Sequence, residues 1–123
     1  MKSADSYQQG DIVVLTKMTW GSTSIVKRII ATEGQTIDID FDNGIVYVDG
    51  EALYEPYINE LTHRRLDFVG EQVVPAGCVF CMGDNRNAST DSRRNTIGMI
   101  DTRSILGKVV LRLWPLNSIG RVS

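Results

Sequence analysis

Residues 83–93 form the stretch of the sequence best suited to chemistry, because none of these eleven residues carries an apolar side chain larger than that of alanine. The loop follows the apolar run at residues 79–82, which reads as a buried strand. A polar loop that leaves a buried strand is a common place for catalytic groups, since the scaffold holds the loop in position. An ordinary turn, with Asp84, Asn85 and Asn87 bonding to their own backbone, has the same composition. Both interpretations stay open on composition alone.

Lys27 is a second candidate for chemistry, because it lies on an expected strand at residues 25–32. Period-two alternation places Lys27 on the same strand face as Ile25 and Ile29, and places Arg28 on the other face. A lysine on an apolar face either protects a sheet edge against aggregation or is a deliberately desolvated amine. Desolvation lowers the pKa of a lysine, which is what a general base near neutral pH requires. Arg28 is then either a solvated charge or one half of a structural ion pair.

The amino-acid sequence of the polar loop resembles the last signature box of the bacterial type I signal peptidases, which are serine proteases with a Ser/Lys dyad. The matching positions are Gly83-Asp84-Asn85-Arg86, Ser89 and Asp91-Ser92-Arg93. The resemblance covers roughly residues 9 to 116 and runs in order through Gly10-Asp11-Ile12-Val13-Val14, Val26-Lys27-Arg28-Ile29-Ile30, Gly107-Lys108-Val109-Val110 and Leu113-Trp114-Pro115.

The resemblance assigns roles to individual residues. It implies that Lys27 is the general base and that the Ser89 hydroxyl orients its amine, as a third group orients the base in other triads. Asp91 and Arg93 match a pair that braces the loop, and Asp84 matches an acid that pairs with Arg28. We therefore expect the Lys27 amine within hydrogen-bond reach of Ser89, Arg28 paired with Asp84, and Asp91 paired with Arg93.

The nucleophile of the family is a serine in a Ser-Met-x-Pro-Thr-type box before the Gly10-Asp11 box, and residues 1–9 contain no match to it. We therefore expect this chain to be a catalytic-domain fragment without its membrane anchor and nucleophile box, and to be inactive alone. Neither Ser3 nor Ser6 is followed by the methionine and proline of the box. Three further serines are interpreted as polar surface residues: Ser92, Ser104 and Ser118.

The resemblance also implies the substrate and the location. Family members remove signal peptides from exported preproteins after Ala-x-Ala-like sites, at the extracytoplasmic face of the bacterial cytoplasmic membrane. Shallow apolar pockets select the small residues and reject larger ones by clash. By position, Val14 and Val26 match the pocket residues, although core packing alone would also explain both. The expected partners are signal peptides and, through an N-terminal anchor, the membrane.

Two other functions remain open. A self-cleaving repressor-type peptidase shares the Ser/Lys dyad and cuts at a small dipeptide, and Ala76-Gly77 occurs here. The Ala76-Gly77 pair fits a turn better than a cleavage site. The repressor type also does not account for the motif at residues 83–93. A non-catalytic β module that binds peptides along a sheet edge is the alternative from a different class.

Composition excludes several other classes. A formal net charge of −2 with scattered lysines and arginines argues against nucleic-acid binding. No apolar run approaches the ~20 residues of a membrane-spanning helix. Cys78 and Cys81 lie three apart on an expected strand and so face opposite ways, which favours buried hydrophobes over a shared metal. His63 is the single histidine and lies in a charged run, so we expect it at the surface and expect no metal and no cofactor.

The elements that position these groups are mostly β-strands. Strands are expected at residues 12–15, 25–32, 36–41, 45–48 and 107–114, with a strong hairpin signal at the turn 42–44. Residues 73–80 are expected to return to strand through a Pro/Gly turn. The fold class is therefore mostly β, an antiparallel coiled β-sheet or barrel-like core of the signal peptidase type with an inserted β-hairpin region. One catalytic-type domain is expected over residues 1–123, with a core of 9–35 and 73–116 and an inserted region at 36–72.

Overall fold

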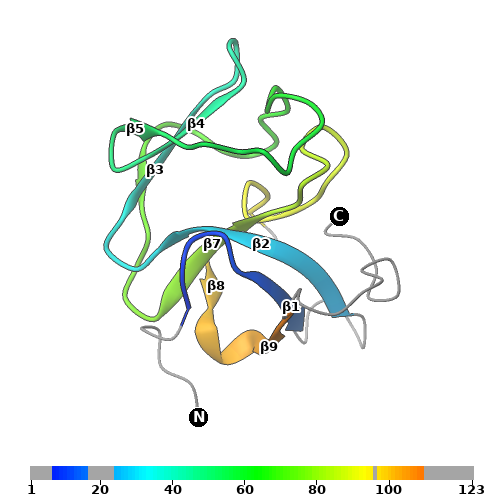
Figure 1. Cartoon of the computed structure of the whole chain (residues 1–123). Coiled ribbons are helices and arrows are strands. Elements are labelled where there is room, and N and C mark those ends of the chain that lie inside the picture. Colours follow the sequence, from blue (N-terminus) through cyan, green and yellow to red (C-terminus); the bar gives the residue numbers. More distant parts are fainter. Residues whose placement is uncertain (1–6, 17–23, 96, 110–123) are drawn as a thin grey trace.

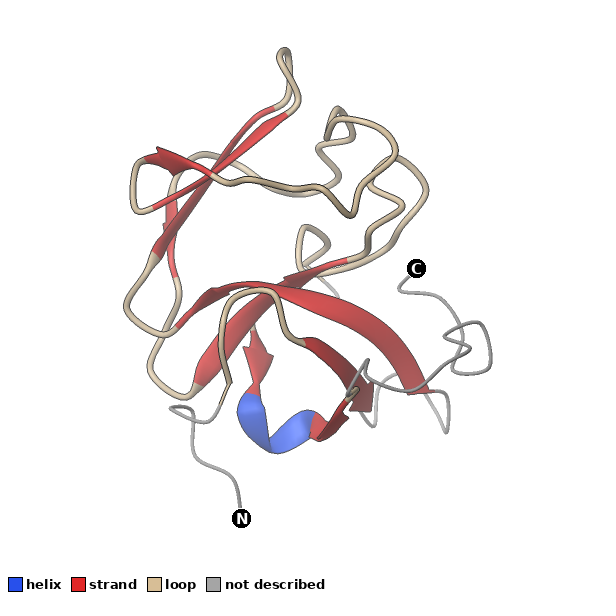
Figure 2. Ribbon diagram, in the orientation of Figure 1, coloured by secondary structure: helices blue, strands red, loops and turns tan. Residues whose placement is uncertain are grey.

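The computed structural model describes residues 7–16, 24–95 and 97–109, and in these ranges it is built almost entirely from antiparallel strands (Figure 1). The expectation of a mostly β, antiparallel fold is confirmed. The described residues contain one short 3-10 helix, Thr102–Ser104, where the sequence left a turn or short helix open (Figure 2). No helix among the described residues has the length and apolar character needed to cross a bilayer.

The larger sheet has five strands in the order β8-β7-β2-β1-β9 and occupies the lower half of Figure 1. β2 lies at its centre and pairs with β1 on one side and β7 on the other. This central place rules out the interpretation of Lys27 as a guard of a sheet edge. The strands are β1 (Ile12–Thr16), β2 (Ser24–Thr32), β7 (Cys78–Met82), β8 (Ile100–Asp101) and β9 (Ile105–Lys108).

The smaller sheet has four strands in the order β5-β4-β3-β6 and lies in the upper half of Figure 1. Its centre is the hairpin that the alternating pattern predicted, with Ile37 opposite Val48 and Ile39 opposite Val46. The strands are β3 (Thr36–Asp40), β4 (Ile45–Val48), β5 (Glu51–Ala52) and β6 (Gln72–Val73). The division into a core and an inserted region at 36–72 stays a prediction.

Buried apolar side chains form two clusters on opposite faces of β7. One cluster joins the two sheets and includes the edge-to-face rings of Phe41, Phe68 and Phe80. The other lies inside the curve of the larger sheet and includes buried Cys81. Cys78 packs against the first cluster and is only partly buried, so the two free thiols face opposite ways as period-two alternation requires.

The last expected strand begins earlier than the alternation indicated. β9 starts at Ile105, two residues before the expected start at Gly107, because Leu15 of β1 pairs with Ile105 across a register shift. A bulge inserts an extra residue into one strand, so it moves the boundary without changing the alternating pattern that a sequence shows. The rest of that expected strand, from residue 110 onward, lies outside the described residues.

Gly44 is a position in the hairpin turn where a side chain is excluded. Its φ is +74°, and an added Cβ would overlap the Leu61 side chain and lie 3.0 Å from the Thr62 nitrogen. Thr62 N donates a hydrogen bond to the Gly44 carbonyl at 3.0 Å. The turn thereby anchors the segment that follows β5.

We expect Gly44→Ala to lower the free energy of unfolding by roughly 2–4 kcal/mol, because the clash adds to the cost of a left-handed alanine. Gly50→Ala is the matched control, since Gly50 has φ +80° but no atom within 4 Å of an added Cβ. The control should lose only about 1–2 kcal/mol. Urea denaturation of both variants measures the difference, and equal losses would show that the contact with Leu61 is unimportant.

Candidate active site

Lys27 lies on β2 with its side chain in the interior, and the residue is 4% exposed. Its Nζ donates to the Ser89 Oγ at 2.8 Å, a contact between positions 62 apart in the sequence. The expected proximity of Lys27 and Ser89 is confirmed. β2 and β7 pair directly, so the loop that leaves β7 at Met82 is brought over the centre of β2.

Ser89 connects the amine to a buried carboxylate. Its Oγ lies 3.1 Å from Asp91 Oδ2, which also accepts from the Gly83 backbone N–H at 3.0 Å. A carboxylate only accepts, so the single hydroxyl proton of Ser89 points to Asp91 and the oxygen accepts from Lys27. This arrangement suits Ser89 to orienting the amine and not to attacking a substrate.

Asp91 is held by Arg93 in a bidentate ion pair, with Nε to Oδ1 and Nη2 to Oδ2 both at 2.9 Å. Both side chains are fully buried. Arg93 also donates to the carbonyls of Arg64 at 2.7 Å and Arg86 at 2.8 Å. The expected Asp91–Arg93 pair is confirmed, and its remaining donors are directed to backbone oxygens, as a buried guanidinium requires.

Arg28 points to the other face of β2 and forms the expected pair with Asp84. Nε and Nη2 donate to the two carboxylate oxygens at 2.9 and 2.8 Å, and Nη1 donates to the Gly10 carbonyl at 3.1 Å. The guanidinium also stacks 3.9 Å above the centre of the Tyr57 ring. The residue after Lys27 is thus fixed to the start of the loop that carries Ser89.

Burial lowers the pKa of the Lys27 amine below its ordinary value of 10.5. Asp91 acts in the opposite direction and raises the pKa, whereas the positive charge of Arg93 lowers it further. The net direction is downward because desolvation of the ammonium is the largest effect. A neutral amine held by a hydroxyl can accept a proton from a nucleophile, which is the chemistry of a general base.

The Lys27 amine should therefore lose its proton below pH 10.5. Between the pKa of the folded protein and that of the unfolded chain, only the unfolded chain binds this proton, so the free energy of unfolding rises as pH rises through that window. Below the pKa of the folded protein both states bind the proton, so Lys27 makes no contribution to the change of stability with pH there. An NMR titration of the Lys27 side-chain resonances checks the direction, and titration at or above 10.5 would contradict it.

Val14 and Val26 face each other across the β1–β2 register, and both are partly buried. Val13, not Val14, is opposite Lys27. The two valines therefore lie on the strand face that carries Arg28 and not on the face of the amine. Their assignment to a substrate pocket stays a prediction.

The expectation for Ser92 was wrong. Ser92 is buried, its N–H donates to the Cys81 carbonyl, and its Oγ accepts from the Cys81 N–H at 3.0 Å. The serine continues the hydrogen bonding of β7 at Cys81, beyond Cys78 and Val79, which pair with β8. The residue type alone does not indicate this burial. Ser104 is partly buried, and His63 is exposed as expected, with Nδ1 2.8 Å from the Phe41 carbonyl. Ser3, Ser6 and Ser118 lie outside the described residues.

Two residues of the loop have roles that the sequence did not indicate. Arg86 is fully buried and forms an ion pair with Glu55. Asn87, interpreted as a turn residue, binds the Leu61 carbonyl and the N–H groups of His63 and Arg64. Both residues belong to the motif at residues 83–93. Their partners lie in residues 55–64, where the apolar residues show no clear periodicity.

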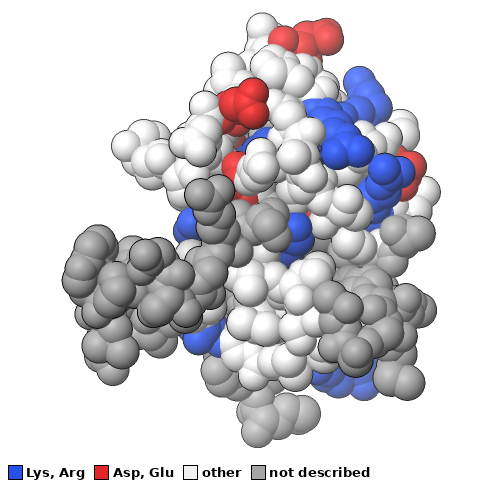
Figure 3. Space-filling view, turned by 90° about the vertical axis from the view of Figure 1, so that its right-hand side faces the viewer, with Lys and Arg blue, Asp and Glu red and all other residues white. Residues whose placement is uncertain are grey.

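The structure also places the Ala76-Gly77 pair, the potential metal ligands and the surface charges. Ala76 and Gly77 form a turn before β7, in which Gly77 N donates to Glu33 Oε1 at 2.8 Å. Within the described ranges no group of three or more histidine, cysteine, aspartate or glutamate side chains could hold a metal ion. On the face shown in Figure 3, lysine and arginine side chains occur at several separate places, with acidic side chains among them in the upper half.

Comparison with known proteins gives a family, two sequence relatives and a similar solved structure. The family model described as "Signal peptidase, peptidase S26" matches residues 1–114. The chain is 41% identical over 99 residues to a probable signal peptidase I-1 of Synechocystis, covering 80% of this chain and 47% of the relative. It is 40% identical over 103 residues to the signal peptidase I of Bacillus caldolyticus, covering 75% of this chain and 54% of the relative.

The fold is also similar to that of a solved protein. The crystal structure of a signal peptidase I from Enterococcus faecalis superposes with a TM-score of 0.69 at 27% identity, covering 85% of this chain and 97% of that chain. The chain spans about half the length of the two sequence relatives described above.

Proposed function

Because the chain belongs to the signal peptidase family, peptidase S26, we propose that it provides the general-base part of a Ser/Lys serine endopeptidase of the signal peptidase I type. The observation that carries the proposal is the buried Lys27 amine, 2.8 Å from Ser89 and linked through it to the Asp91–Arg93 pair. This network supplies what a lysine base needs: a lowered pKa and a fixed direction.

In the proposed mechanism the neutral Lys27 amine takes a proton from a serine hydroxyl as that oxygen attacks the scissile carbonyl. An acyl-enzyme forms, and the Lys27 ammonium gives the proton to the departing amine. The departing amine is the N-terminus of the shortened protein, so the signal peptide stays on the acyl-enzyme. Water then attacks the ester with Lys27 again as the base, the proton returns to the serine oxygen, and the signal peptide is released. The nucleophile in this proposal is a serine other than Ser89, because the Ser89 proton is directed to Asp91.

The proposed substrates are signal peptides of exported preproteins with alanine at the first and third positions before the cut. Val14 and Val26 are proposed to line the apolar surface that accepts these small side chains, supported by their adjacent, partly buried positions. Location at the bacterial cytoplasmic membrane, with the catalytic domain on its extracytoplasmic face, belongs to the same proposal. It is supported by the similarity to signal peptidases alone.

A peptide cleavage assay tests the proposal. A fluorogenic peptide with alanine at both positions is offered to the natural full-length gene product and to residues 1–123, beside a peptide with leucine at the first position before the cut. We expect the full-length product to cleave after alanine and to reject leucine by at least 10-fold, as for a side chain too large for its pocket. Equal cleavage of both peptides, or no cleavage by the full-length product, would overturn the assignment.

A further inference from the structure

Residues 55–67 pack along the loop that carries Ser89, and Figure 1 shows the two segments, green and yellow, side by side. The contacts are specific and come from several loop residues. Arg86 reaches Thr62, Asn87 binds three backbone groups, and Arg93 donates to the Arg64 carbonyl. The segment between β5 and β6 therefore supports the loop that carries Ser89.

Arg86 is the most buried of these connections. Its Nη1 donates to Thr62 Oγ1 at 3.0 Å, its Nε donates to the Gly83 carbonyl at 2.9 Å, and its guanidinium forms an ion pair with Glu55. The Arg86 side chain is fully buried and that of Glu55 is nearly so. Such a pair is costly to break from one side, because the remaining charge stays in the interior.

The backbone of Gly83 links this ion pair to the candidate base. Arg86 binds the Gly83 carbonyl, while the Gly83 N–H donates to Asp91 Oδ2 at 3.0 Å. The same carboxylate oxygen accepts from Ser89, which in turn contacts Lys27. A continuous series of polar contacts thus runs from Glu55 to the Lys27 amine.

Tyr57 forms a second connection from the same segment. Two guanidinium groups lie over its ring, that of Arg28 at 3.9 Å and that of Arg86 at 5.9 Å from the ring centre. Burial raises the pKa of its phenol to about 12, so the ring stays neutral at ordinary pH. Tyr57 therefore contacts both the arginine that follows Lys27 and the arginine that binds Glu55.

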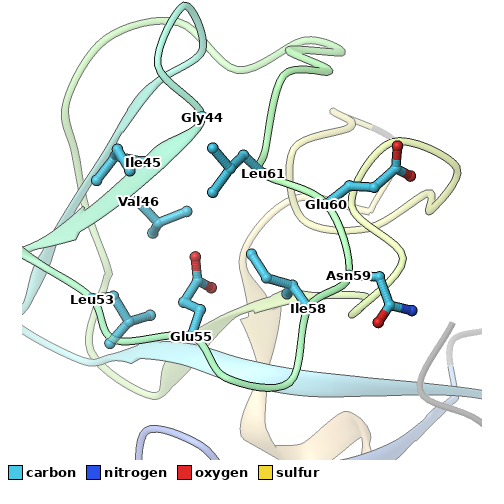
Figure 4. Close-up of a pocket in the computed structure, with 9 residues that line it drawn as sticks. All are labelled: Gly44, Ile45, Val46, Leu53, Glu55, Ile58, Asn59, Glu60 and Leu61. Atoms are coloured by element: carbon cyan, nitrogen blue, oxygen red, sulfur yellow. The ribbon is translucent and has the colours of Figure 1, made fainter.

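The surroundings of Glu55 make its ion pair sensitive to substitution. Glu55 lines a pocket of about 240 Å³ together with apolar side chains that include Val46, Leu53 and Ile58 (Figure 4). Apolar neighbours give an unpaired charge little compensation. A change at Glu55 should act directly on Arg86, because the guanidinium that it pairs with is fully buried.

We propose that Glu55 is a positioning residue, which acts through Arg86 and the Gly83 backbone to hold the Asp91–Ser89 pair against the Lys27 amine. This inference rests on the proposed role of Lys27 as a general base, but its test measures the amine and the loop instead of turnover. The two proposals can therefore fail separately.

Glu55→Gln tests the inference, because glutamine keeps the shape of the side chain and removes its charge. The charged and titratable groups facing Lys27 are Asp91, Arg93, Cys81 and Asp84. Loosening the loop hydrates the amine and raises its pKa, whereas mere loss of the remote negative charge would lower it. The sign of the change thus distinguishes positioning from a distant charge effect.

We expect Glu55→Gln to raise the Lys27 pKa in an NMR titration and to speed amide exchange at Gly83 roughly tenfold or more, as in local opening. Glu60→Gln is the control, since Glu60 lies in the same segment and is exposed; it should change neither quantity. An unchanged or lowered Lys27 pKa, or unchanged exchange at Gly83, would overturn the proposal.

A second variant keeps the test decisive if Glu55→Gln does not fold. Glu55→Asp retains the charge but shortens the side chain, so it should raise the Lys27 pKa and Gly83 exchange in the same directions by a smaller amount. Wild-type values for both in this variant would overturn the proposal as well. If the unsubstituted protein has no peptidase activity, by contrast, that result contradicts only the proposed function.

Discussion

Peptide cleavage is expected to fall by about 10³-fold or more when Lys27 is replaced by methionine, because general-base catalysis contributes on this scale and the Lys27 amine is the proposed base. Methionine has a similar length and is apolar, so it fits the buried position of Lys27. The fall should appear in kcat, since the amine acts on the proton of the nucleophile and not in substrate binding. The assay is turnover of the alanine peptide by the full-length gene product.

Stability should change in the opposite direction to activity. The Lys27 ammonium is desolvated in the folded protein, which is why its pKa is lowered. Methionine removes this cost, so at neutral pH the free energy of unfolding of Lys27→Met should equal or exceed that of the parent. Lys108→Met is the control for activity, because Lys108 lies on β9 beside Asp11 and is exposed. Full activity in Lys27→Met would remove Lys27 from the mechanism.

Asp91→Ala should give the largest loss of stability, about 3–5 kcal/mol in the free energy of unfolding, because it leaves Arg93 buried without its counter-ion. The same substitution removes the acceptor of the Gly83 N–H and of the Ser89 hydroxyl. A loss of this size is a large part of the total stability of a typical domain. Urea denaturation at neutral pH measures it.

A second Asp-x-Arg pair in the chain provides the control. Asp101 and Arg103 form an ion pair with the same spacing as Asp91 and Arg93, but their side chains are 44% and 80% exposed. Solvent screens that pair, so Asp101→Ala should change stability much less than Asp91→Ala. Similar effects of the two substitutions would show that burial is not the source of the stability of the Asp91–Arg93 pair.

The local pattern of the sequence located several of the strands, and its resemblance to the signal peptidases indicated the residue pairs of the site. Alternation located β1, β2 and the β3–β4 hairpin, because one face of each strand is buried and the side-chain period is two. The wording of residues 83–93, read with Lys27 and Arg28, indicated the contacts Lys27–Ser89, Arg28–Asp84 and Asp91–Arg93. These contacts were implied by the resemblance of two short motifs to those of the family, in which the same residue types stand at fixed positions.

Only the tertiary structure decided what lies around those motifs. The central position of β2 depends on strand pairing between residues far apart, so the sequence left Lys27 open as an edge residue. The register shift that begins β9 at Ile105 is likewise invisible to alternation. The partners of Arg86 and Asn87 lie in residues 55–64, where no periodic pattern marks a fold. A buried polar group takes whichever partner the folded chain brings within reach, and for Arg86 that partner is Glu55, 31 positions earlier in the sequence.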